Sequence, residues 1–407
     1  MEKRLLNTAV IVAALGYFVD IYDLLLFGFV RQKSLLGLGF SPEQAFDLGL
    51  SIQNWQMFGM LTGGVLWGVL GDKKGRVSVL YFSIAMYSVA NILNGFVTGY
   101  ADYALYRFIA GVGLAGELGA GITLVAEILP KEKRGLGATL VAAIGLTGAL
   151  LAWVIDHFFA WKTCYFIGGG LGIGLLLLRI SVAESGMFHQ VKAQRGIKRG
   201  SFVALFTSWD RFSRFLRCIF IGSSTWFVVG ILVFFSPEFG KVKGVEGIVA
   251  GNAIAAAYTG LIAGDIISGL LSQFWRSRLK VMAAFLVLDV VAVALYLYLP
   301  FTAAWQMYLA HFFLGLSVGF WVIFVTIGAE QFGTNLRATV ATSVPNFARG
   351  MQVPINESFK YLKSAAVTGS VISAAWIVGL VTLAVSFIAL YGMQETFDRD
   401  LDYVEEI

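Results

Sequence analysis

The chain has 407 residues, of which 58% are hydrophobic and only 14% are charged, and its mean hydropathy is +0.77. Ordinary globular domains are about 25% charged, so this composition excludes a protein made only of water-soluble domains. The net charge of +5 does not indicate nucleic-acid binding, because the basic residues cluster in short segments between long apolar runs. The two cysteines, Cys164 and Cys218, predict neither a disulfide framework nor a metal site.

Apolar runs long enough to cross a bilayer as helices recur from one end of the chain to the other. Twelve can be placed, at residues 7–30, 49–70, 77–98, 103–128, 136–157, 163–182, 214–235, 247–272, 279–299, 305–328, 337–357 and 367–392. The first run has acids and lacks a small-residue cleavage site, so we expect a retained span and not a signal peptide. We therefore predict an all-α membrane protein with twelve transmembrane helices embedded in a lipid bilayer.

The basic residues are distributed unevenly between the loops on the two sides of the bilayer. With both termini on one side, that side receives 21 of the 30 Lys and Arg, the other side receives 7, and Arg107 and Arg349 lie within spans. Positive charge marks the cytoplasmic side. We therefore expect a multi-pass protein of a bacterial-type inner membrane with both termini in the cytoplasm.

The first span carries two carboxylates, Asp20 and Asp23, which lie on one helical face because they are three residues apart. An ionisable group in the bilayer core costs at least about 2.5–3.5 kcal/mol, so such groups usually face a bundle interior or a watery cavity. The fourth span carries Arg107 and Glu117, and helical rise places the aspartates between them in depth. We predict either a proton-accepting network of these four groups or a static ion pair of Arg107 with one aspartate.

The chain contains an internal repeat. Residues 107–114 align with 311–318, and residues 126–135 align with 329–338, at offsets of 204 and 203 residues. Repeats of this kind form transporters whose halves move about a central site near the bilayer midplane. In this alignment His311 is equivalent to Arg107, and a position close to Trp321 is equivalent to Glu117, so the intramembrane acids of this network belong to the first half.

Four regions follow from the repeat and from the longest polar segment. They are a first six-helix bundle at 1–182, a cytoplasmic linker at 183–211, a second six-helix bundle at 212–392 and an acidic cytoplasmic tail at 393–407. We expect the linker and the tail to be solvated.

The second half contains a buried basic residue, Arg349, in a span that has Pro345 and Pro354 and so can bend. A guanidinium in such a place can bind a carboxylate or a phosphate, or it can pair with an acid of a neighbouring span. Aromatic and polar residues could complete a substrate site, although each alone is more often a packing residue. The candidate substrate-binding set is Arg349, His311, Trp226, Trp321, Asn346 and Gln352.

The loop at 68–76 reads G-x-x-x-D-x-x-G-R and resembles the signature of the major facilitator superfamily. Further stretches at 107–113, 115–120, 127–135 and 179–185 resemble the metabolite:proton symporter and the sugar and organic-acid porter branches. The resemblance implies two pseudo-symmetric six-helix bundles, alternating access, and a conformational latch on the cytoplasmic side. The implied latch residues are Gly68, Asp72, Gly75, Arg76, Glu127, Arg134, Glu330 and Arg337. In the second-half counterpart, at 269–278, Gln273 replaces the acid.

These observations predict a secondary transporter that takes up a small polar metabolite, an organic anion or an acidic sugar, together with protons. One alternative is a proton-antiport exporter of a drug-like or siderophore-like compound. The resemblance disfavours it, because the drug/proton antiporters of this superfamily carry a Gly-Pro pair in the fifth span, and the matching residues 145–150 contain no proline. A second alternative is a non-transporting membrane sensor. The sequence has no nucleophile constellation, nucleotide-binding loop or metal-ligand spacing, so we expect no enzymatic activity, no cofactor and no metal. We also expect a monomer.

Overall fold

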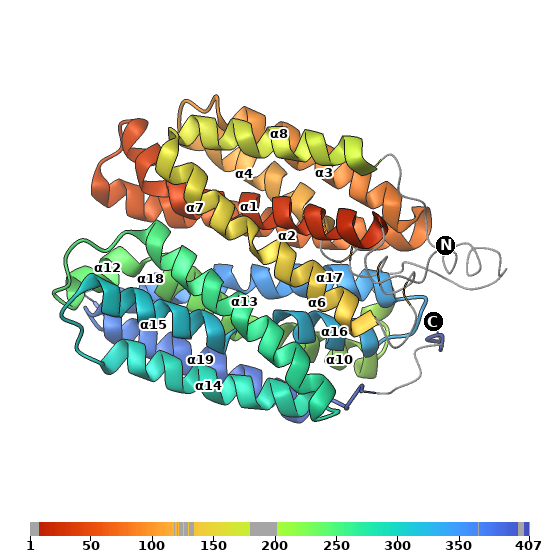
Figure 1. Ribbon diagram of the computed structural model, residues 1–407. Coiled ribbons are helices and arrows are strands. Elements are labelled where there is room, and N and C mark those ends of the chain that lie inside the picture. Colours follow the sequence, from red (N-terminus) through yellow and green to blue (C-terminus); the bar gives the residue numbers. More distant parts are fainter. Residues whose placement is uncertain are drawn as a thin grey trace. The chain divides into compact units, whose positions relative to one another are not determined.

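The computed structural model describes residues 8–117, 119, 121, 125, 129, 134–179, 202–364, 366–397 and 403–406. Throughout these residues the regular structure is helical, and Figure 1 shows the helices in chain order. Each predicted apolar run falls on one or more helices, which confirms the predicted all-α membrane fold.

The first six runs correspond to seven described helices. Their bounds are α1 (Thr8–Gly37), α2 (Pro42–Lys74), α3 (Arg76–Asn94), α4 (Tyr100–Leu114), α6 (Arg134–Leu146), α7 (Gly148–Phe158) and α8 (Trp161–Arg179). The fifth run is thus divided between α6 and α7. Residues 115 and 116 form a turn after α4, and residue 117 is helical again.

The last six runs are more interrupted. The structure has η2 (Phe202–Phe206), α10 (Trp209–Phe220), α11 (Ser223–Phe227), the π-helical turn η3 (Val228–Val233), α12 (Ser236–Val242), α13 (Ala250–Phe274), α14 (Arg278–Tyr298), α15 (Ala304–Ser317), α16 (Trp321–Glu330), α17 (Arg337–Gly350), α18 (Gln352–Lys363) and α19 (Val371–Tyr391). The predicted spans 214–235, 305–328 and 337–357 are therefore discontinuous helices.

Among the described residues, nine helical stretches are long and apolar enough to cross a membrane by themselves. The other three predicted spans lie on α2, on α4 with the residues after it, and on α17 with α18. The α17 helix is poor in apolar residues because it buries a series of polar side chains, namely Thr339, Thr342, Ser343, Asn346 and Arg349. Buried polar groups of this kind mark a helix that faces protein and not lipid.

The chain divides into two compact units. Unit 1 contains Met1–Phe215, Val325–Phe347 and Asp398–Ile407, and unit 2 contains Leu216–Phe324 and Ala348–Phe397. Within unit 1 the first part of α17 packs closely on α2, since a β-carbon at Gly64 would lie 2.9 Å from Cβ of Asn346. The division into bundles at 1–182 and 212–392 remains a prediction.

The predicted repeat has a counterpart in how helices pack inside each unit. In unit 1 a β-carbon at Gly59 of α2 would lie 2.1 Å from the carbonyl oxygen of Phe108 on α4. In unit 2 a β-carbon at Gly260 of α13 would lie 1.9 Å from the carbonyl oxygen of Phe312 on α15. Both helix pairs thus need glycine at the crossing, where small residues let backbones approach closely. Phe108 and Phe312 differ by the same 204 residues as the sequence repeat.

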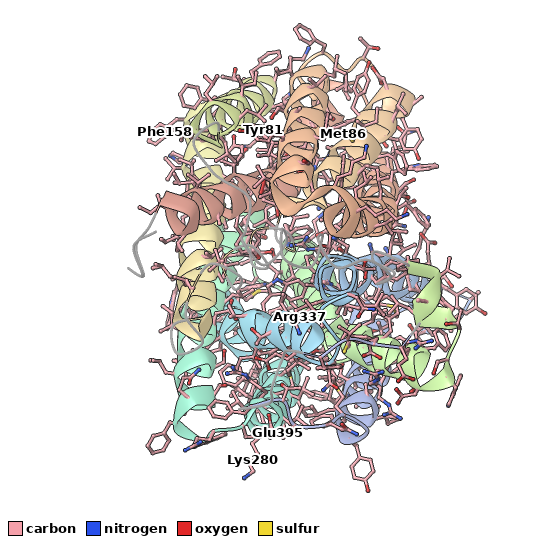
Figure 2. All side chains as sticks on the ribbon, turned by 90° about the vertical axis from the view of Figure 1, so that its right-hand side faces the viewer. Tyr81, Met86, Phe158, Lys280, Arg337 and Glu395 are labelled. Carbon is pink, nitrogen blue, oxygen red and sulfur yellow. The ribbon has the colours of Figure 1, made fainter. Side chains whose placement is uncertain are left out.

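The segment after α19 differs from the solvated tail that we expected. Glu395 accepts hydrogen bonds from the backbone N–H groups of Arg278, at 2.9 Å, and Leu279, at 3.2 Å, and from the hydroxyl of Ser277. Figure 2 shows Glu395 close to Lys280, at the beginning of α14. A carboxylate suits this place because the first N–H groups of a helix lack partners and carry partial positive charge.

This cap makes a pH-dependent contribution to stability. Burial by itself would raise the pKa of Glu395, but the hydrogen bonds from Ser277 and from the helix N–H groups outweigh burial and lower that pKa. A lowered pKa means that the contribution is present at neutral pH and is lost as the pH falls through the folded-state pKa. Replacing Glu395 with glutamine should lower the melting temperature by about 1–3 °C at pH 7, the usual effect of losing a cap.

The difference in melting temperature between wild type and the Glu395→Gln variant should shrink as the pH falls below the ordinary pKa of a glutamate, because the unfolded chain then binds a proton more readily than the folded chain does. Thermal unfolding in detergent, followed by tryptophan fluorescence at several pH values, measures it. Glu406→Gln is the matched control, because that side chain is exposed. A difference of equal size at pH 7 and pH 3.5 would contradict the assignment.

Candidate functional site

In unit 1 a buried ion pair joins α1 to α4. Arg107 Nη1 lies 3.5 Å from Asp23 Oδ1, and Arg107 Nη2 donates to the carbonyl oxygen of Asp23 at 3.2 Å. Both side chains are fully buried. Of the two predicted aspartates, the structure therefore brings Asp23 to the guanidinium. Asp20 and Glu117 are also buried in this unit, with 0% and 2% exposure.

Aromatic and polar side chains surround the pair. The Arg107 guanidinium lies 5.8 Å from the ring centre of Tyr165 on α8. The hydroxyl of Tyr165 is 2.7 Å from that of Tyr103, which is in turn 3.1 Å from the Ser34 hydroxyl. The network thus links α1, α4 and α8, and it contains hydroxyl groups that can both donate and accept hydrogen bonds.

This geometry can couple a proton to helix packing. While Asp23 is ionised, its charge balances that of Arg107, and both groups avoid the cost of an isolated buried charge. Protonation of Asp23 would remove that balance and weaken the contact between α1 and α4. Proton uptake at this carboxylate would therefore favour a rearrangement of the two helices or the arrival of another anion.

In unit 2 a second buried guanidinium lies against two indole rings. The Arg349 guanidinium is 6.0 Å from the ring centre of Trp226 and 5.6 Å from that of Trp321. The two indoles contact each other edge to face, with ring centres 5.8 Å apart. Arg349 is 1% exposed, and the tryptophans are 5% and 4% exposed. These three predicted substrate-binding residues therefore form one cluster.

The cluster forms where three discontinuous helices are interrupted. Trp226 lies in α11 directly before the π-helical turn η3, Trp321 is the first residue of α16, and Arg349 is in the last turn of α17. Interruptions of this kind supply ligand-binding groups in many transporters, because they leave backbone groups and side chains free to face a cavity. Pro345 lies inside α17 and indicates one of these irregular helices from sequence alone.

Two buried acids support the cluster without being part of the predicted set. Asp265 of α13 accepts the backbone N–H of Val322 at 3.2 Å and so caps the start of α16 beside Trp321. Asp289 of α14 accepts a hydrogen bond of 3.2 Å from the Ser317 hydroxyl on α15. Both acids thus connect helices, as intramembrane acids that face a bundle interior often do.

The remaining predicted substrate-binding residues have other surroundings. The His311 ring nitrogens lie 2.6 Å from the carbonyl of Met307 and 3.4 Å from that of Leu232. Asn346 belongs to unit 1, where its amide donates to the carbonyl of Ala115 at 2.8 Å. Gln352 is fully buried against Gly230 of η3, whose β-carbon would lie 2.3 Å from the Gln352 amide nitrogen.

Among the described residues of the predicted latch, the contacts are made mainly with backbone atoms. Gly75 separates α2 from α3 with φ of 104°, a conformation that favours glycine. A β-carbon at Gly68 would lie 3.1 Å from the carbonyl oxygen of Thr339. Arg337 donates to the carbonyl of Phe332 at 3.5 Å, and Glu330 is half-buried at the end of α16. Glu127 and the side chains of Asp72, Arg76 and Arg134 lie outside the described part of the chain.

Comparison with known proteins places this arrangement in a family. Residues 7–352 match the model of the Major Facilitator Superfamily. A putative metabolite transport protein of Haemophilus influenzae is 31% identical over 356 residues, which cover 84% of this chain and 86% of that protein. A putative niacin/nicotinamide transporter NiaP of Bacillus subtilis is 29% identical over 232 residues, 56% of this chain and 55% of that protein.

Solved structures agree on the fold. The proton:xylose symporter XylE, bound to 6-bromo-6-deoxy-D-glucose, superposes with a TM-score of 0.75 over 97% of both chains. The sequence identity is 15%, so the likeness concerns the fold and not the cargo.

Proposed function

The chain belongs to the Major Facilitator Superfamily, and we propose that it imports a small organic anion together with protons by alternating access. The family consists of transporters and the protein is not an enzyme. The proposal concerns the finer points: the anion, the proton, the inward direction, and an inner membrane with both termini in the cytoplasm.

The Arg349 cluster is the observation that carries the proposed cargo. A guanidinium presents a planar fork of donors that matches a carboxylate, and its charge can neutralise the carboxylate inside a low-dielectric site. The edges and faces of Trp226 and Trp321 offer contacts to a flat apolar body. An aromatic monocarboxylate combines both features, and the niacin/nicotinamide relative from Bacillus subtilis is consistent with this choice.

The Asp23–Arg107 pair supports the proposed proton coupling. Asp23 would accept a proton when the site faces outward, and the loss of its charge would loosen the buried contact with Arg107. The helices of the first bundle would then rearrange as the cargo is enclosed. Asp20 and Glu117 remain further candidates for the proton, and the predicted latch residues would stabilise the closed cytoplasmic side.

A ligand screen followed by an uptake assay tests the function. Purified protein is heated with nicotinate, benzoate, nicotinamide, glucuronate or xylose, since a ligand that binds the folded state raises its melting temperature. We expect stabilisation by nicotinate or benzoate and none by the neutral nicotinamide or xylose. In proteoliposomes, an inward proton gradient should then drive accumulation of the stabilising anion.

Three outcomes would overturn or change the proposal. Stabilisation by xylose or nicotinamide alone would exclude an anion site, and stabilisation by glucuronate alone would replace the aromatic carboxylate with an acidic sugar. Uptake that does not change when the proton gradient is collapsed would exclude proton coupling.

A further inference from the structure

Residues 403–406, the tail segment, are bound in a cradle formed by residues far away in the sequence. The cradle consists of Arg211, Arg214, Gln331, Thr334 and Asn335, all of which belong to unit 1 together with the tail segment. The expectation of a solvated tail is therefore wrong for Tyr403 and Glu405, which are half-buried, whereas the side chains of Val404 and Glu406 are exposed. The cradle lies at the start of α10 and in the turn between α16 and α17.

The backbone of the tail segment is held by one backbone hydrogen bond and by the side chain of Asn335. The N–H of Thr334 donates to the carbonyl of Tyr403 at 2.8 Å. The Asn335 side chain makes hydrogen bonds to both backbone groups of Glu405. It accepts from the N–H at 2.9 Å and donates to the carbonyl at 3.0 Å. Such pairing recognises an extended peptide, as in the addition of a strand to an open edge.

The side chain of Glu405 gives the contact its charge specificity. Its two carboxylate oxygens lie 3.0 and 3.2 Å from the two terminal nitrogens of Arg214. The carboxylate is 9% exposed and the Arg214 side chain 19% exposed, so solvent screens this pair less than it screens a surface pair. Arg214 also donates to the carbonyl of Gln331 at 2.7 Å and stacks on Phe332.

These contacts immobilise a turn that matters for the proposed mechanism. The turn connects Glu330 at the end of α16 to Arg337 at the start of α17, and both residues belong to the predicted latch. Arg214 bridges the turn to α10, and its guanidinium is held by Asp210 within α10 and by Glu405 of the tail segment. Helices that move during alternating access would carry this turn with them, so a docked tail segment opposes their movement.

We propose that residues 403–406 are a releasable clamp, an acidic extended peptide whose docking restrains the α16–α17 turn and whose release frees it. The occupant is the chain's own tail segment, because the ion pair and the backbone pairing are both made by it. Release costs only the net free energy of one ion pair and a few hydrogen bonds, which is much smaller than their gross strength because the separated groups regain hydrogen bonds to water.

Hydrogen–deuterium exchange of the full-length protein in detergent tests the clamp. Glu405→Gln removes the tail's charge from Arg214 and leaves Asp210, at 2.7 Å, as the other acid that pairs with it. We expect about tenfold faster exchange of the Thr334 amide and of the first turn of α17, because exchange reports local opening. Glu406→Gln is the matched control, since it removes the same charge from an exposed neighbour. Peptides from α13 should exchange equally in all three proteins.

A crosslink provides the opposite perturbation. Thr334→Cys with Tyr403→Cys should form a disulfide on oxidation, slow exchange of the α16–α17 turn, and lose that protection when a reductant is added. The native Cys164 and Cys218 are buried and serve as the background. Equal exchange in Glu405→Gln and Glu406→Gln would overturn the clamp, and so would a crosslink that forms without slowing exchange of the turn. Neither readout needs the cargo, so both are independent of the proposed substrate.

Discussion

Replacing Arg349 with glutamine should weaken binding of the anionic cargo by about 30-fold to about 4,000-fold, while the protein still folds. The range follows from about 2–5 kcal/mol for losing one partner of a buried charged hydrogen bond. Arg349 is the guanidinium that two indole rings enclose, at 6.0 and 5.6 Å. Titration of the purified protein with the anion that stabilises it most gives the affinity directly.

Two further variants separate charge from geometry at this position. Arg349→Lys keeps the positive charge but loses the planar fork, so its affinity should lie between those of wild type and Arg349→Gln. Lys241→Gln removes one positive charge from an exposed residue and should leave affinity unchanged. If Arg349→Gln binds the anion as tightly as wild type, Arg349 is a packing residue and the anion site lies elsewhere.

Replacing Asp23 with asparagine should abolish accumulation of the cargo by a proton gradient. The variant cannot exchange a proton at this position, and it leaves Arg107 buried without its partner charge. Removing one partner of a buried pair costs about 3–5 kcal/mol, so a lower melting temperature should accompany the loss. Exchange of labelled for unlabelled cargo across the membrane needs no net proton movement and should survive.

Comparison of variants around Asp23 identifies the titrating group. Asp20→Asn should retain more gradient-driven uptake than Asp23→Asn, because Asp23 is the aspartate that contacts Arg107. Tyr165→Phe removes one hydroxyl of the surrounding network and no charge, so uptake should still respond to the gradient. If both Asp23→Asn and Glu117→Gln respond to the gradient as wild type does, the proton site is not in this network.

The buried acids show how far sequence reasoning reaches at a site. The spacing of Asp20 and Asp23 predicts that both face one side of the first helix, and helical rise predicts that they lie between Arg107 and Glu117 in depth. Neither observation says which aspartate meets the guanidinium. The choice depends on the rotation of α1 against α4, which packing across the whole helix pair decides.

The substrate cluster shows the same limit. The sequence predicts that Arg349, Trp226 and Trp321 lie in three spans, where each tryptophan alone is most simply a packing residue. Their convergence depends on interruptions after α11, before α16 and at the end of α17. Proline indicates only the last of these. Before α16, Gly319 packs against the backbone of α13, where a β-carbon at Gly319 would lie 2.4 Å from the α-carbon of Gly264.

Composition, hydropathy and motif spacing determined the all-helical membrane fold, the number of spans and the family, because these depend on local periodicity and on the cost of polar groups in lipid. The internal repeat is also visible in the sequence, because equivalent helix crossings in the two halves need glycine at equivalent positions. Tertiary structure alone decided that Asp23 is the partner of Arg107, that two indoles enclose Arg349, and that Glu405 docks on Arg214. Asp23 and Arg107 are 84 positions apart in the chain, and Arg214 and Glu405 are 191 apart. Their distances are set by helix rotation and helix interruption, which no local pattern encodes.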